Sequence, residues 1–99
     1  MENYKCYDLP CYDSRRSFYG KARVLEDRDG SRMLQSYSTN ICTISAAGTL
    51  SKLDPVATVT TRRHIRSFFA HCGYAYPGNC AWDALPLHRE VPLTKGGAA

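Results

Sequence analysis

The sequence predicts an α+β fold in which an antiparallel β-meander of three or four strands packs against one main α-helix, followed by a short C-terminal extension. Two patterns predict this fold. The residues before position 60 alternate with the two-residue period of strands, whereas residues 60–73 place apolar side chains at helical spacing. A chain of 99 residues with 43% apolar side chains is long enough for one domain with a modest core.

The N-terminal stretch 1–16 is polar, rich in tyrosine and interrupted by Pro10, and we interpret it as an irregular arm with a short extended piece at 4–7. The single α+β domain is predicted over residues 12–73. Its first clear strand is expected at 17–25, where small side chains on one face leave room for the helix. The residues on that face are Phe18, Gly20, Ala22 and Val24.

Turns divide the rest of the predicted sheet. Residues 26–30 end in Asp-Gly, which supplies the positive φ that a hairpin needs. A second extended region at 31–45 has an ambiguous alternation, so we expect a bulge or a bend across 38–40. A tight turn at 46–48 leads to a short third strand at 49–53, which closes the meander.

The helix predicted at 60–73 has a start, an end and one apolar face. Thr60 or Thr61 can cap its first amides, and Gly73 is typical of the residue just after a helix. Because the helix has a single apolar stripe, we expect it to cover one face of the sheet. The residues of this stripe are Ile65, Phe68, Phe69 and Cys72.

Residues 74–99 are predicted to form the C-terminal extension, partly frayed at its end. A helical turn at 80–85 can dock Trp82 and Leu85, while the later prolines prevent a long closing helix. These prolines are Pro86 and Pro92.

Composition restricts the compartment and the class of protein. No run approaches the ~20 apolar residues of a membrane span, and the N-terminus has acids but lacks the apolar core of a secretory signal. We therefore expect a cytoplasmic protein with no membrane contact. The odd number of cysteines, five, then argues against a disulfide framework. Cys42 and Cys72 lie within apolar patterns and are predicted to be small buried side chains.

We expect no catalytic residues, no metal and no cofactor. Zinc binds cysteine and histidine, but their spacing here matches no zinc motif, and His64 and His71 lie about 10.5 Å apart along one helix. No nucleophile motif surrounds any cysteine, and no glycine-rich phosphate loop is present. The chain is therefore predicted not to be an enzyme.

Basic and aromatic side chains give the candidate binding residues. The net charge of +4 permits an anionic partner without requiring one. Three arginines near the start of the helix oppose its dipole, which a phosphate or an acidic protein surface would relieve; the alternative is a solvated face with local acids such as Asp54. The first strand has an aromatic and basic face that can stack bases and hold phosphates, or that is simply a polar sheet face. The candidate binding residues are Arg15, Arg16, Tyr19, Lys21, Arg23, Tyr37, Arg62, Arg63 and Arg66.

Three elements in this order resemble a small domain family carried by phages of gut and dairy bacteria. They are SFYGKA at 17–22, SY-x-T at 36–39 and TT-x-x-HI-x-x-F at 60–68. The resemblance extends over about residues 12–73. That family has no assigned biochemical role, so the resemblance implies no catalytic residues.

Within these elements the chain departs from the family at Ser38, where relatives often have asparagine, and at Ser67, where they tend to have an acidic residue. Tyr37, Thr39 and His64 either contribute to a binding surface or simply knit the sheet to the helix. We expect His64 in the first helical turn, where the dipole keeps it neutral.

These observations together favour a small non-enzymatic phage or prophage accessory protein that acts by binding. The sharper hypothesis is an anti-CRISPR-like inhibitor whose partner is a bacterial host protein, such as a CRISPR nuclease complex, in the host cytoplasm. The mild positive charge argues against mimicry of nucleic acid. One alternative is a nucleic-acid-binding phage regulator, whose binding would fall steeply with salt. The other is a virion or assembly component that self-associates through a strand edge.

Overall fold

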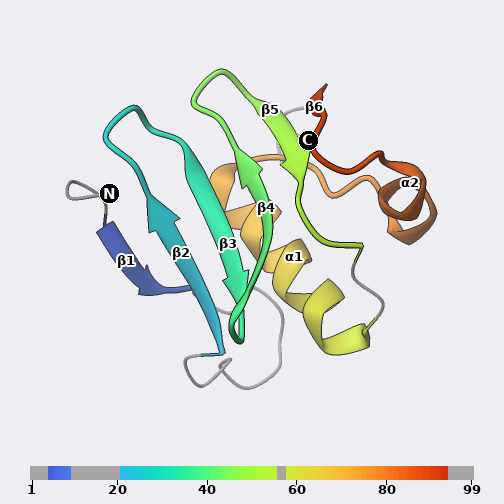
Figure 1. Cartoon of the computed structure of the whole chain (residues 1–99), viewed down its shortest axis with the longest axis horizontal. Coiled ribbons are helices and arrows are strands. Elements are labelled where there is room, and N and C mark those ends of the chain that lie inside the picture. The colour runs from blue at the N-terminus through green and yellow to red at the C-terminus, as the bar shows by residue number, and fades with distance from the viewer. Residues whose placement is uncertain (1–4, 10–20, 56–57, 94–99) are drawn as a thin grey trace.

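The computed structural model describes residues 5–9, 21–55 and 58–93, and these residues form an α+β protein. Six strands make one antiparallel sheet in sequence order, and one main helix lies against one face of that sheet (Figure 1). The strands are β1 (Lys5–Asp8), β2 (Ala22–Glu26), β3 (Arg32–Ser36), β4 (Thr39–Ile44), β5 (Thr49–Lys52) and β6 (Glu90–Pro92). The helices are α1 (Val59–Cys72) and the shorter α2 (Asn79–Ala84).

The predicted fold class is confirmed, but the prediction of three or four strands is wrong. Part of the reason lies at the edges of the sheet. β1 corresponds to the short extended piece expected at 4–7 within an irregular arm, but it is a strand of the sheet and pairs along its length with β2. β6 lies within 74–99 and pairs with β5. Such short strands are held by their neighbours in the sheet, so their own sequence signals them weakly.

The other reason is the region 31–45, which forms two strands joined by a turn at Tyr37 and Ser38. The expected irregularity is present as a bulge next to this turn. Leu34 pairs with Cys42 but Gln35 pairs with Asn40, so Ile41 is an extra residue on β4. One extended region therefore becomes a hairpin with its own register.

The predicted main helix is confirmed, and α1 begins slightly earlier than expected. Its cap is Thr58 rather than Thr60 or Thr61, and the Thr58 hydroxyl accepts a hydrogen bond from the Thr61 amide at 3.2 Å. Gly73 ends the helix in the left-handed conformation, with φ of 86°. His64 consequently lies in the second turn of α1 rather than in the first.

The core lies between α1 and the sheet. Ala22 and Val24 point toward the helix while Lys21 and Arg23 are exposed, as the alternation predicted. Trp82 of α2 is fully buried, which confirms that residues 80–85 dock onto the core. The buried apolar residues are Leu9, Ala22, Val24, Leu34, Ile41, Cys42, Ile44, Leu50, Ile65, Phe68, Phe69 and Trp82. Neither helix in the described residues has the length and apolar character needed to cross a bilayer.

Candidate functional site

The turn between β3 and β4 presents Tyr37 to solvent in an unusual backbone conformation. Tyr37 is the first of the two turn residues, has a φ of 56° and is 54% exposed. The favoured two-residue hairpin turns need positive φ at this position, which is why glycine, asparagine or aspartate usually stands there. A tyrosine in this conformation costs strain, and such strain is concentrated at functional sites.

Side chains from α1 and the end of β3 support the turn from below. Ser36 Oγ lies 2.8 Å from His64 Nδ1 and 3.4 Å from Thr61 Oγ1, so one hydroxyl joins the sheet to two positions of the helix. The His64 ring lies next to the Tyr37 ring, with centroids 6.0 Å apart and the ring planes tilted by 43°. Lys21 completes the arrangement. Its carbonyl accepts the Tyr37 amide at 2.7 Å, and its Nζ lies 5.9 Å from the centroid of the Tyr37 ring.

We call this group of five residues the motif corner: Lys21, Ser36, Tyr37, Thr61 and His64. Each of the three sequence elements at 17–22, 36–39 and 60–68 contributes at least one of them. Segments separated by many residues therefore meet at one place in the fold. His64 joins the helix to the sheet, as one of the two interpretations holds, whereas Tyr37 lies at the surface and its part in a binding surface stays a prediction.

His64 is a neutral imidazole at neutral pH. Burial lowers its pKa from 6.5 to about 4, and the nearby charges of Arg63 and Lys21 act in the same direction. The predicted neutrality is therefore supported, but its main cause is burial in the helix–sheet interface rather than the helix dipole. A neutral ring can share one proton with the Ser36 hydroxyl without introducing a buried charge.

The structure separates the candidate binding residues. Arg15, Arg16 and Tyr19 lie outside the described residues. Lys21 and Tyr37 meet at the motif corner. Arg23 lies on the opposite face of β2 from Val24, where its Nε is 3.8 Å from an Asp8 carboxylate oxygen.

The helix arginines lie in different surroundings. Arg63 is half-buried beside His64. Arg62 pairs with Asp83 of α2 at 2.7 Å, and the Arg66 guanidinium lies 5.5 Å from the centre of the Tyr76 ring. Arg62 and Arg66 therefore contact the C-terminal extension. The predicted alternative of a local acidic partner describes Arg62, although the acid is Asp83, whereas Arg66 faces an aromatic ring.

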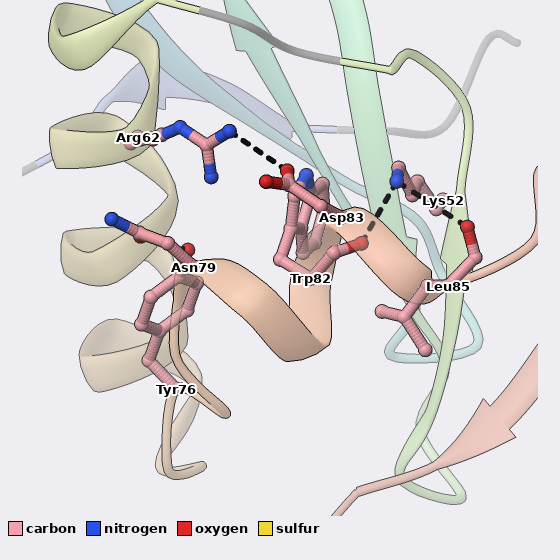
Figure 2. A network of polar contacts seen from close by, with 7 residues as sticks. All are labelled: Lys52, Arg62, Tyr76, Asn79, Trp82, Asp83 and Leu85. Carbon is pink, nitrogen blue, oxygen red and sulfur yellow. Dashed lines mark hydrogen bonds and ion pairs between the residues drawn. The ribbon is translucent and has the colours of Figure 1, made fainter.

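A buried lysine completes the attachment of this extension (Figure 2). Lys52 of β5 is only 4% exposed, and its Nζ donates to the carbonyls of Trp82 at 2.8 Å and Leu85 at 3.3 Å. The Lys52 Nζ also lies 5.3 Å from the centre of the Trp82 ring. We call this group the extension junction: Lys52, Arg62, Trp82, Asp83 and Leu85.

Sequence reasoning overlooked Lys52 and Ser36, although strand alternation carried a signal for both. Lys52 shares the inward face of β5 with Leu50, and Ser36 shares that of β3 with Leu34. A polar residue on a buried face needs a partner, so each position pointed to a contact with another element. Within the described ranges, no three side chains of histidine, cysteine or acidic residues gather in a group that could hold a metal ion.

Comparison with known proteins places this chain in a family. A family model described as "Family of unknown function (DUF8033)" matches residues 8–79, which is well over half of the chain. The protein belongs to the DUF8033 family. The motif corner lies entirely within the matched span, whereas Trp82 and Asp83 of the extension junction follow it. No curated protein and no solved structure matches the chain.

Proposed function

We propose that this DUF8033 protein is a small non-enzymatic phage or prophage accessory protein that acts by binding a bacterial host protein. The sharpest form of the proposal is an inhibitor that sterically blocks a defence nuclease, such as a CRISPR complex, in the host cytoplasm. The phage setting is supported by the resemblance of the three sequence elements to a phage-carried family. The binding role is supported by the motif corner.

The observation that carries the binding role is an exposed Tyr37 held in a fixed position. Its strained turn is hydrogen-bonded to Lys21, and its ring lies next to the buried ring of His64. Tyrosine is frequent at interface hot spots because it offers a large amphipathic surface and loses little conformational entropy.

The surroundings of the basic side chains favour a protein partner over a nucleic acid. Tracking a phosphate backbone takes several unneutralised cations along one surface. Arg23, Arg32 and Arg62 instead face carboxylates of this chain at 3.8, 3.3 and 2.7 Å. Lys52 is buried. Lys21, which has no carboxylate partner in the described part of the chain, accordingly suits a local acidic group on a protein surface.

The test is affinity capture from a nuclease-treated bacterial lysate, using the tagged full chain and matched variants. Tyr37→Asn removes the ring but suits the positive φ of the turn, so the fold is expected to be kept. Leu87→Asn is its control, because Leu87 is also an exposed apolar side chain, 42% exposed, but lies in the C-terminal extension. Lys21→Glu is matched by Arg89→Glu, another exposed charge reversal.

We expect one host protein at near-equimolar yield, with capture reduced about tenfold or more by Tyr37→Asn and Lys21→Glu but not by the controls. Inhibition of the captured nuclease in a cleavage assay then tests the sharper form. Capture of RNA or DNA alone, lost after nuclease treatment, would replace this proposal with the nucleic-acid regulator. Recovery of only a second copy of the chain would favour the assembly component.

A further inference from the structure

A further polar group, separate from the motif corner and the extension junction, surrounds Arg32. It lies at the opposite end of α1 from the motif corner. Tyr7 Oη lies 2.7 Å from His71 Nε2 and donates to Glu26 Oε2 at 3.1 Å. The same carboxylate oxygen lies 3.3 Å from Arg32 Nε. Side chains from three strands and from the last turn of the helix thus form one polar group around Arg32. Hydrophobic side chains would stabilise this interface at a lower desolvation cost.

Arg32 and Cys72 also line a pocket of about 130 Å³. It lies where the tips of two hairpins meet the end of the helix, and three of its seven lining residues come from the hairpin connections. The lining residues are Gly30, Arg32, Ile44, Ser45, Ala46, Cys72 and Tyr74. A volume of this size admits a small group such as a phosphate or a carboxylate but not a whole nucleotide or peptide, whose pockets usually exceed about 300 Å³.

The Arg32 side chain is fixed on one side and open on the other. Glu26 holds the guanidinium, and Tyr7 in turn holds Glu26. Arg32 Nε is buried and makes no well-formed hydrogen bond within the described residues, yet the side chain as a whole remains 33% exposed. A guanidinium has five N–H donors in a rigid fork, so contact with Glu26 leaves donors for a second acceptor in the pocket.

The groups around Arg32 do not compete for an anion. Burial raises the pKa of Tyr7 to about 12 and lowers that of His71, so the phenol and the imidazole are neutral at neutral pH. Burial likewise raises the pKa of the Cys72 thiol above its usual range, so it remains a protonated donor. Glu26 is then the one anion of this polar group, and it already faces Arg32.

We propose that this pocket binds a small oxyanion, either a phosphoryl or a carboxylate group, through the Arg32 guanidinium, with the Cys72 thiol as a neutral donor. Arginine recognises both kinds of group because two of its N–H bonds match two of their oxygens. The pocket is separate from the motif corner, so this proposal does not depend on the proposed partner.

The experiment is an NMR titration of the labelled full chain with inorganic phosphate and, separately, with acetate, at constant ionic strength. Saturable shifts are expected at the backbone amides of Gly30, Ala46 and Tyr74. Arg32→Met should weaken binding about tenfold or more, since it removes a charged hydrogen-bond donor. Arg23→Met is the matched control, because Arg23 is another strand arginine that faces a carboxylate, and it should bind as the parent does.

Saturation by phosphate alone assigns a phosphoryl group, saturation by acetate alone assigns a carboxylate, and saturation by both assigns a site for either. The proposal is wrong if neither anion saturates these amides, or if the two arginine variants behave alike. If Arg32→Met does not fold, Glu26→Gln decides the matter. It keeps the shape and hydrogen bonds of Glu26 but removes its charge, so binding should become a few times tighter, and weaker binding contradicts the proposal.

Discussion

Two of the polar junctions that α1 makes with segments far away in the sequence, the motif corner and the extension junction, differ in what they leave exposed. At the motif corner, the buried hydrogen bond between Ser36 and His64 joins helix to sheet, while Tyr37 and Lys21 remain at the surface. At the extension junction, Lys52 is directed onto backbone carbonyls beneath α2 (Figure 2). Arg62 is likewise directed onto Asp83.

This difference separates charges that hold the fold from charges that are available to a partner. Lys52, buried against two carbonyls, and Arg62, paired with Asp83 at 2.7 Å, have their donors engaged in holding the fold. Lys21 is exposed and has no carboxylate partner among the described residues, so it can contribute to binding without first breaking an ion pair. The net charge of +4 does not show which basic residues hold the fold and which are available to a partner, since it counts both kinds alike.

The largest expected effect tests whether the extension junction is part of the core. Trp82→Ala should lower the free energy of unfolding by about 3–5 kcal/mol, because it empties a fully buried aromatic site. Urea unfolding followed by circular dichroism measures this loss. Trp82→Phe is the control and should cost much less, since Trp82 Nε1 makes no hydrogen bond within the described residues. A small effect of the alanine variant would mean that the extension is only loosely attached.

The next effect tests the motif corner through pH. The folded-state pKa of His64 is about 4, below its ordinary 6.5, so between these values the unfolded chain binds a proton that the folded chain does not. Stability should therefore be full above pH 6.5, fall as the pH is lowered through this window and level off below pH 4. A shift of this size corresponds to about 3 kcal/mol.

His64→Asn provides the comparison, because an asparagine Oδ1 can take the place of Nδ1 opposite Ser36 but does not titrate. The variant should be less stable at pH 7 and should lack the fall between pH 6.5 and 4, measured by urea unfolding across the range. Other titrating groups are common to both proteins and cancel in the difference. Identical pH slopes for the two proteins would remove His64 as the source.

The layers could be predicted because their periodicities are local properties of the sequence. Lys21 and Arg23 alternate with Ala22 and Val24, which assigns the faces of β2 without knowledge of its neighbours. The apolar stripe of α1 likewise needs only helical spacing. The number of strands was harder to predict because Tyr37 is not a typical turn residue, so the hairpin at 31–45 had the pattern of one extended region with a bulge or a bend.

The candidate site could be predicted only as separate pieces. Tyr37 and Lys21 were predicted as candidate binding residues, but their contact depends on the pairing of β2 with β3, a tertiary feature. The link from Ser36 to His64 depends on the register of β3 beneath α1. The roles of Arg62 and Arg66 depend on where the extension docks, and no local pattern specifies that position.

A smaller effect tests the buried cation of the extension junction. Lys52→Met keeps the apolar stem but removes the donor to the Trp82 and Leu85 carbonyls, so we expect a loss of about 1–2 kcal/mol from unpaired buried acceptors. Lys5→Met, at an exposed lysine of β1, is the control and should change stability little. If both variants are equally stable, the Lys52 contacts are offset by the cost of burying its charge.

The smallest expected effect on stability makes the sharpest comparison between the two junctions. Each has a cation near a tyrosine ring: Lys21 at 5.9 Å from Tyr37, and Arg66 at 5.5 Å from Tyr76. Lys21→Met and Arg66→Met should each cost only about 0.5 kcal/mol, the usual value of such a contact at an exposed site. Affinity capture should nevertheless separate them, because we expect only Lys21→Met to weaken retention of the host partner. Equal retention by both variants would place the partner elsewhere on the molecule, and equal loss would extend its interface from the motif corner to the C-terminal extension.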